Sequence, residues 1–275
     1  MKYKQKLSVL VTLFTVMMVN AQDFQGVATY KSHRKFDFND ENFKKDSKVS
    51  PEMQKQIEDQ LRQQSQQEYT LNFNRNESIY TKNEKLAAPM PSRGGITINF
   101  SDGADVRYKN LKEQRFTNQT EVYGKQFLIK DSLKGQQWEL LNETKNIGQY
   151  TCFKAQITEQ VKTQTMTEDK GIETVMKEKV TTAWYTPQIP VSNGPAEFFG
   201  LPGLILEIND GKLTLICSKI IINPEDVITI DEPKKGKVVT QQEFNDIMEK
   251  KNKEMMDQMN SRGNSGGTVI FRSGR

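Results

Sequence analysis

Short apolar segments with strand-like alternation recur along most of the chain. The first, 24–30, mixes β-branched and aromatic residues, and similar segments follow at short intervals with Gly-containing turn signals between several of them. The expected strands are 24–30, 69–73, 78–82, 96–100, 105–109, 114–118, 125–130, 137–141, 149–158, 173–186, 203–209 and 212–222. Because strands and helices do not alternate, a parallel α/β fold is disfavoured. The pattern predicts a mainly β fold, a curved antiparallel meander that is open or forms a half-barrel.

Two helices are expected beside these strands. Residues 51–67 are polar with a narrow apolar stripe, typical of a short inserted helix, and residues 240–259 carry apolar side chains roughly on one side of a charged helix. The Gly-, Ser- and Arg-rich residues 261–275 are expected to form a disordered tail. The expected organisation is therefore a single mainly β domain over 22–230, followed by a linker and helix over 231–260.

The clearest turn signal is Asn209-Asp210-Gly211, between two apolar segments. Asp-Gly provides the positive φ angles of a two-residue type I′ hairpin turn. Strand alternation would then place Leu204, Leu206 and Ile208 on one face, opposite Leu213, Leu215 and Cys217 of the partner strand.

The first residues are typical of a signal peptide. Lys2, Lys4 and Lys6 precede an uncharged run of thirteen residues, 7–19, and Val19-Asn20-Ala21 ends in the small residue that a signal peptidase needs. The run is shorter than the roughly 20 residues that span a bilayer. We therefore expect export by the Sec pathway after removal of 1–21, a periplasmic or extracellular location that is soluble or associated with the outer membrane, and no transmembrane segment in the mature chain.

The charge of the mature chain argues against a nucleic-acid partner. The full sequence has a net charge of +4, and removal of three signal-peptide lysines leaves 4 − 3 = +1. A nucleic-acid-binding protein needs a dominant positive surface, so basic runs such as 234–237 are better explained as solvated surface.

Cys152 and Cys217 both lie in apolar, strand-like segments. An oxidising compartment would permit a disulfide between them, and the alternative is two buried free thiols that act as small apolar side chains. No Cys-x-x-Cys spacing indicates a redox or zinc site.

A distinctive motif lies in the second half of the chain. Residues 200–205 read Gly-Leu-Pro-Gly-Leu-Ile, after the blocks 147–155 and 183–186. On these segments the chain resembles the GLPGLI family of secreted proteins, found chiefly in Bacteroidetes, from about residue 138 to 222. The resemblance implies an exported, mostly β protein of unknown activity, and it supplies no catalytic residues.

The motif has a structural interpretation and a functional one. Gly200, Pro202 and Gly203 favour a type II turn that makes 187–203 a rigid loop, with Phe198 and Phe199 packed inward. A rigid loop on a β scaffold is also a usual place for a binding site. The candidate binding residues are Trp184, Tyr185, Glu197 and Glu207. Glu207 has a second explanation, because alternation places it on the solvated side of its strand.

No catalytic or metal-binding set is readable in the sequence. The one histidine, His33, lacks spaced partners for a zinc site, and carboxylate pairs cannot be identified from spacing because they meet only in space. Methionines of the C-terminal helix suggest copper as a minor alternative to packing, because thioethers bind Cu(I). The candidates are Met248, Met255, Met256 and Met259. We therefore expect no cofactor and no metal site.

Two classes of function follow. The favoured one is a non-catalytic envelope or secreted binding protein, whose partner is unknown and is either another envelope protein or a small ligand. The alternative is a secreted hydrolase with carboxylates that the sequence does not identify. Convergent acidic residues in a deep pocket would favour the hydrolase, and a shallow apolar surface would favour binding.

Overall fold

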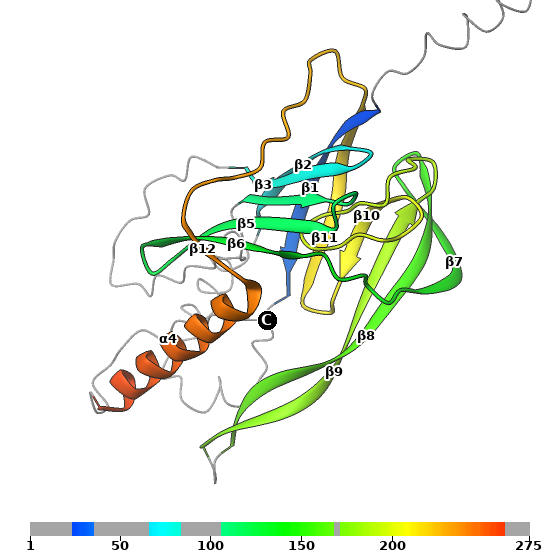
Figure 1. Cartoon of the computed structure of the whole chain (residues 1–275). Coiled ribbons are helices and arrows are strands. Elements are labelled where there is room, and N and C mark those ends of the chain that lie inside the picture. Colours follow the sequence, from blue (N-terminus) through cyan, green and yellow to red (C-terminus); the bar gives the residue numbers. More distant parts are fainter. Residues whose placement is uncertain (1–23, 36–65, 84–105, 168–170, 262–275) are drawn as a thin grey trace, which may run out of the picture.

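The computed structural model describes residues 24–35, 66–83, 106–167 and 171–261 as one open sheet and one helix (Figure 1). The strands are β1 (Gln25–Arg34), β2 (Glu68–Asn74), β3 (Glu77–Lys82), β4 (Val106–Asn110), β5 (Arg115–Val122), β6 (Lys125–Ser132), β7 (Glu139–Ile147), β8 (Tyr150–Thr167), β9 (Gly171–Thr186), β10 (Leu204–Asn209), β11 (Leu213–Ile222) and β12 (Lys237–Val239), and the helix is α4 (Gln241–Ser261). The mainly β prediction is confirmed, and the sheet is open.

The order of strands in the sheet is β12-β6-β5-β4-β3-β2-β1-β11-β10-β9-β8-β7. All neighbours are antiparallel except β12, which pairs with β6 in parallel. The meander β2–β6 and the hairpins β7–β11 form the two halves. Strand β1 lies between them, so it joins the halves into one sheet.

One face of the sheet, the inner face, carries the main core. On β2 the buried side chains are Tyr69, Leu71 and Phe73, at every second position, as period-two alternation predicts. They pack with Tyr30 of β1 and with the loop 187–203, whose Phe198 is also buried. The other face is called the outer face below.

A second apolar cluster lies under α4. Phe116, Val122, Phe127, Ile129 and Val239 are buried there. The helix packs against them through Phe244, Ile247 and Met248. The predicted C-terminal helix is therefore confirmed, and β12 continues the sheet inside the stretch that was expected to be a linker.

Helix α4 begins with a capping box. The Thr240 backbone N–H donates to Glu243 Oε2 at 2.7 Å, and the Glu243 N–H donates to Thr240 Oγ1 at 3.2 Å. These two bonds satisfy N–H groups that a helix start leaves without partners.

Among the described residues, no helix is long and apolar enough to cross a membrane.

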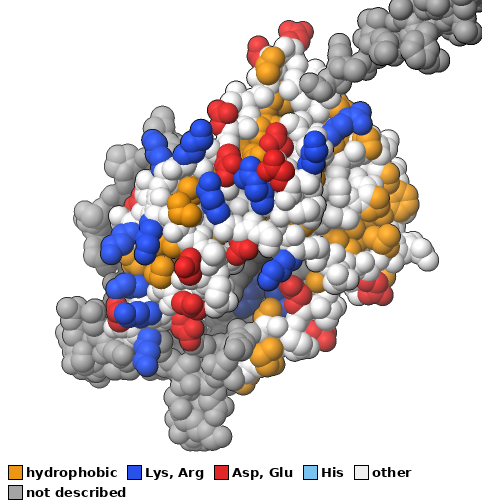
Figure 2. Space-filling view, viewed as in Figure 1, with side chains coloured by type: hydrophobic (Ala, Val, Ile, Leu, Met, Phe, Trp, Pro, Cys, Tyr) orange, Lys and Arg blue, Asp and Glu red, His pale blue; other side chains and the backbone are white. Residues whose placement is uncertain are grey.

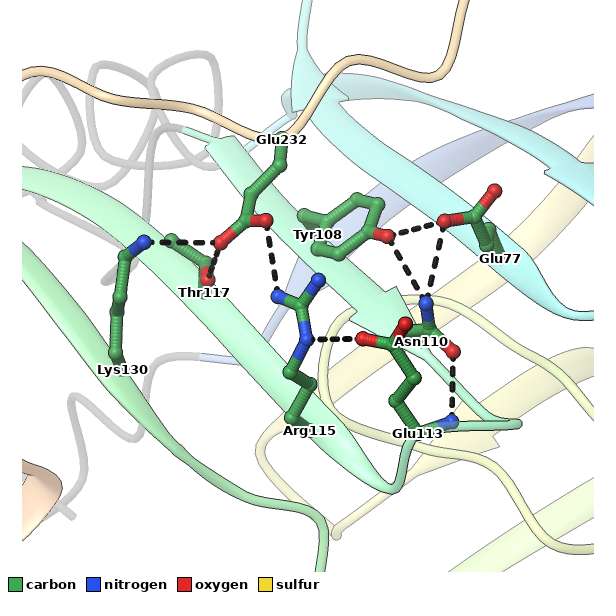
Figure 3. A network of polar contacts seen from close by, with 8 residues as sticks. All are labelled: Glu77, Tyr108, Asn110, Glu113, Arg115, Thr117, Lys130 and Glu232. Atoms are coloured by element: carbon green, nitrogen blue, oxygen red, sulfur yellow. Dashed lines mark hydrogen bonds and ion pairs between the residues drawn. The ribbon is translucent and has the colours of Figure 1, made fainter.

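The chain returns from β11 to β12 along the outer face, through residues 223–236, the crossing segment. Glu232 of this segment accepts from Thr117 Oγ1 at 2.6 Å and forms ion pairs with Arg115 at 2.9 Å and Lys130 at 3.1 Å (Figure 3). Burial raises the pKa of Glu232, but the hydrogen bonds from these three residues outweigh it and lower the pKa to about 2. The carboxylate therefore fastens the segment to β5 and β6.

The network continues toward β3 and β4. Tyr108 and Asn110 both donate to Glu77, and Asn110 Oδ1 accepts from the Glu113 backbone N–H at 2.8 Å (Figure 3). Arg115 also contacts Glu113, at 2.5 Å. Polar side chains thus tie four neighbouring strands together on the outer face.

Strands β8 and β9 extend beyond the rest of the sheet. β7 pairs with β8 only as far as Gln156, and β10 pairs with β9 only from Thr182 onward. Beyond these points, 157–167 and 171–181 pair with each other alone. This two-stranded arm projects from the body (Figure 1).

Two local expectations about the β10–β11 hairpin are wrong. Only Gly211 of the Asp210-Gly211 pair has a positive φ, +88°, so the turn is not type I′. Instead, Asp210 Oδ1 accepts from the backbone N–H of Lys212 and Leu213 at 3.1 and 2.7 Å. The alternation expected on β10 also fails, because the register shifts at Leu206 and this side chain is buried together with both of its neighbours.

The signal peptide, the strand 96–100, the tail from 262 onward and nearly all of the helix 51–67 lie outside the described residues.

Candidate functional site

The loop 187–203 folds through very tight turns. Backbone N–H groups donate to the carbonyl two residues earlier, from Val191 to Ile189 and from Gly203 to Leu201, both at 2.8 Å. This is γ-turn geometry centred on Pro190 and Pro202, whose fixed φ suits it. The predicted type II turn at Pro202-Gly203 is therefore wrong, although a tight turn does form there.

Position 203 requires a glycine for two reasons: its φ is +151°, and the backbone of Thr186 lies too close for a side chain. A Cβ atom at this position would lie 2.2 Å from the carbonyl oxygen of Thr186. Gly194 is similarly restricted, because a Cβ there would lie 2.8 Å from the Cβ of Ile205. Two glycines thus let the loop pack directly onto β9 and β10.

A buried lysine anchors the loop from the inner face of β4. Lys109 is fully buried, and its Nζ donates to the carbonyl oxygens of Gly194 at 2.8 Å, Ala196 at 3.0 Å and Phe198 at 3.0 Å. Burial and the charge of Arg107 lower its pKa, whereas three carbonyl acceptors favour the ammonium form with its three N–H donors. Lys109 therefore fixes the middle of the loop.

Further side chains hold the rest of the loop. Trp138 Nε1 donates to the Phe199 carbonyl at 2.8 Å, and the Phe199 N–H donates to Gln136 Oε1 at 3.0 Å. Tyr30 donates its hydroxyl to the Ile205 carbonyl at 2.7 Å, just after the loop. Phe198 and Phe199 are both buried, as predicted. The loop is thus tied to β1, β4 and the residues just before β7.

The candidate residue Glu197 meets an arginine on the inner face. Its Oε2 lies 3.5 Å from Nη1 of Arg107, and the Arg107 guanidinium lies 5.0 Å from the ring centroid of Phe116. Desolvation lowers the pKa of Arg107 to about 10. Asn118 of β5 is the direct cross-strand neighbour of Arg107. Charged and amide groups therefore meet between the two apolar clusters.

The candidates Trp184 and Glu207 lie together on the outer face, as cross-strand neighbours of β9 and β10. Lys145 bridges them: its Nζ lies 2.7 Å from Glu207 Oε2 and 4.4 Å from the Trp184 ring centroid. Lys154 approaches the same ring at 6.0 Å and pairs with Glu143. The cluster is a cation–π and ion-pair arrangement in which a lysine already covers the indole.

Tyr185, the remaining candidate, is part of the main core, and its burial raises the pKa of its hydroxyl. The structure therefore separates the four candidates into an outer pair, an inner glutamate and a core tyrosine.

Cys152 and Cys217 are buried free thiols whose pKa values burial raises to about 11 and about 12. Pairing is one of two alternatives left by the sequence, and intact mass before and after reduction can decide between them. His33 is exposed on β1. Within the described ranges, no group of three or more His, Cys, Asp or Glu side chains could hold a metal ion.

The sequence analysis did not single out Lys109, Arg107 or Asn118. In Val106–Asn110 every second residue is basic, which is also the pattern of a solvated strand face. The available signal was that the other face of this strand is not apolar throughout, because it carries Tyr108 and Asn110. Neither face was therefore clearly the buried one. Only the loop folded over β4 shows that its basic residues point inward.

Comparison with known proteins gives a family match without a function. Residues 138–207 match the family described as "Protein of unknown function (Porph_ging)", a segment that contains β7, β8, β9, the loop and the start of β10. No curated protein matches the chain.

Among solved structures, two crystal forms of PNGF-II are similar, with TM-scores of 0.46 and 0.47 and 14% sequence identity. Each match covers 81% of this chain and 32% of the PNGF-II chain, so this chain spans about a third of that protein. The segment that matches the family contains the loop and Trp138, whereas Lys109, Tyr30 and Gln136, which also hold the loop, lie outside it.

Proposed function

We propose that this chain is exported and acts as a non-catalytic binding or accessory protein of the cell envelope. Support for export comes from the lysines and uncharged run of residues 1–21 and from the resemblance of residues 200–205 to the motif of the GLPGLI family. The binding role is supported by the surface that the loop presents.

The observation that carries the binding role is an immobilised loop with apolar residues facing solvent. Pro187, Pro190 and Pro202 are exposed on the loop. On the adjoining strands β7 and β8, Leu140 is 57% and Phe153 37% exposed. These five residues are called the rim surface. Figure 2 shows apolar side chains gathered over this part of the molecule.

Hydrogen bonds connect the parts of the rim surface. Trp138, two residues before Leu140, donates to the loop carbonyl of Phe199, and the Thr151 N–H of β8 donates to Gln188 Oε1 of the loop at 2.9 Å. Contiguous exposed apolar residues typically mark contact sites for other proteins. Because the loop is already fixed by Lys109, a partner would not need to order it on binding, which preserves affinity.

The pKa values and ion pairs of the carboxyl groups give less support to the hydrolase alternative. A general acid needs a raised pKa, whereas every described carboxyl group whose pKa is shifted has a lowered value, because hydrogen bonds outweigh burial. These groups are Asp131, Asp210, Glu232, Glu243 and Glu254. Glu197 and Glu207 each pair with a cation. For the copper alternative, Met248 packs against the second apolar cluster, and the side chains of the other three candidate methionines lie outside the description.

Native mass spectrometry of protein recovered gently from its host's envelope tests the role. We expect a co-purifying polypeptide with the wild-type chain and its loss in the variants Leu140→Asp and Phe153→Ser. The control Val227→Asp changes an exposed apolar residue of the crossing segment and should retain the polypeptide. A bound small molecule would indicate a ligand carrier instead, and a bare monomer would favour the hydrolase.

The same sample tests export. The mature mass should correspond to a chain that begins at Gln22. Recovery of the full-length chain from the cytoplasm would contradict the proposal.

A further inference from the structure

The inner face of β4 is unusual for the interior of a sheet. Its two inward side chains are Arg107 and Lys109, whereas the neighbouring inward positions on either side include members of the two apolar clusters. Burying a charge is costly unless it is paired and hydrogen-bonded. Each of the two cations therefore calls for an explanation.

Lys109 is explained by the loop. Its three bonds to the carbonyls of 194, 196 and 198 use all three N–H donors of the ammonium group. No donor remains for another ligand, and its role is to hold the loop.

Arg107 is not explained in the same way. The guanidinium has five N–H donors, and its ion pair among the described residues, with Glu197, is 3.5 Å long, compared with about 2.7–2.9 Å for a charge-assisted hydrogen bond. Its Nε is buried and has no hydrogen-bond partner among the described residues. The flat side chain is held in place by the ring of Phe116. The guanidinium thus keeps a buried N–H donor that no described residue satisfies.

Asn118 adds an unused acceptor beside these donors. It pairs directly with Arg107 across β4 and β5, the residue is only 5% exposed, and its buried Oδ1 lacks a partner in the described part of the chain. A buried polar atom without a partner costs about 1–3 kcal/mol. A donor and an acceptor therefore lie unsatisfied on adjacent strands, with the carboxylate of Glu197 alongside.

We propose that Arg107, Asn118 and Glu197 form a binding site for a small carboxylate whose adjacent carbon carries a hydrogen-bond donor, an ammonium or a hydroxyl group. The ligand carboxylate binds the guanidinium, for which planar oxyanions are the matching partners. Its donor group faces Asn118 Oδ1 and Glu197. Arg107 and Lys109 against Glu197 leave an excess positive charge, which an anionic group offsets.

The site lies at the edge of the buried interior. The side chains of Arg107 and Glu197 are 16% and 20% exposed, whereas Arg107 Nε and Asn118 Oδ1 are buried, so a ligand first meets the exposed edge of the guanidinium. Figure 2 shows the surface hollowed between β6 and the β8–β9 arm, with basic side chains inside the hollow. The site shares no residue with the rim surface, so the inference stands apart from the proposed partner-binding role.

Thermal unfolding of the mature chain with four probes tests the site: glycine, glycolate, acetate and methylammonium. At a concentration ten times the Kd, glycine or glycolate should raise the Tm by about 3–6 °C. Acetate, which lacks the donor, should have a smaller effect, and methylammonium should have none. The stronger of glycine and glycolate identifies the donor as ammonium or hydroxyl.

Two variants and one control assign the response to the site. Asn118→Leu removes the buried acceptor without changing side-chain size much, so it should fold at least as stably and lose the preference for glycine or glycolate over acetate. Arg107→Lys keeps the charge but loses the planar fork, and should weaken probe binding about tenfold or more. The control Arg115→Lys alters an outer-face arginine of β5 and should bind the probes like the wild type.

The proposal is overturned if neither glycine nor glycolate at about 10 mM, well above a millimolar Kd, raises the Tm of the wild type. It is also overturned if acetate acts as strongly as both, or if folded Asn118→Leu keeps the full preference.

Discussion

At the scale of the residue, the loop 187–203 depends on one missing side chain and one buried charge. Gly203 allows the chain to pass against the Thr186 carbonyl, and Lys109 supplies the donors for three carbonyl groups in the middle of the loop. The role of Gly203 could be suspected from the sequence, because Pro-Gly marks tight turns. The role of Lys109 could not, because a lysine in a strand usually faces solvent.

Gly203→Ala should be strongly destabilising. The added methyl group would overlap the Thr186 carbonyl, and the φ of +151° suits no other residue, so we expect a loss of at least about 3 kcal/mol in the free energy of unfolding in urea. Gly211→Ala is the matched control. Its φ is also positive, +88°, but no atom lies within 4 Å of the new Cβ, so its loss should be near 1 kcal/mol. Equal losses would contradict the close-approach argument.

Lys109→Met should also destabilise, by about 3–5 kcal/mol, because three buried carbonyl groups lose their donor while the side chain keeps its length. The same change at exposed Lys125 of β6 should cost less than about 0.5 kcal/mol. Urea unfolding followed by circular dichroism measures both. A tolerated Lys109→Met would mean that water replaces the ammonium.

At the scale of the element, alternation predicted most of the strands that the structure describes. Alternation did not predict strand lengths that depend on tertiary contacts. Strand β7 continues to Ile147 and β8 to Thr167, and β12 is only three residues long. A three-residue strand carries no period, and its place beside β6 depends on the crossing segment. The four candidate binding residues do not lie together for a similar reason. Spacing along one strand does not show which residues a distant loop covers.

The crossing segment should make stability depend on pH. Glu232 has a lowered pKa, so its contribution is fully present above 4.5, its ordinary value, and is lost as the pH falls through about 2. Glu232→Gln should therefore lower the free energy of unfolding by roughly 1 kcal/mol at pH 7, with the difference from the wild type narrowing below pH 4.5. Urea titrations at several pH values measure this.

The control for the crossing segment is Glu225→Gln, at an exposed position of the same segment. It should leave the pH dependence as in the wild type. A constant gap between Glu232→Gln and the wild type from pH 7 to about 2 would show that packing, and not charge, holds the segment.

At the scale of the whole molecule, the sheet determines which distant residues can meet. Cys152 on β8 and Cys217 on β11 have β9 and β10 between them. Three strand spacings amount to about 14 Å in a flat sheet, whereas disulfide-bonded Cα atoms lie within about 7 Å. We expect both thiols to be alkylated after denaturation without reductant. An intact mass lower by two hydrogen atoms would show a disulfide instead.

The central place of β1 has a consequence for how the protein reaches its folded state. β1 precedes the other described strands in the chain, yet it pairs with β2 on one side and with β11, nearly two hundred residues later, on the other, as in the pair Gly26 and Ile222. Pairings between such distant segments form slowly, because a long loop must close before any contact compensates for its entropy. We therefore expect the meander and the later hairpins to fold as separate local units. The two would become one sheet only after the chain has emerged as far as residue 222.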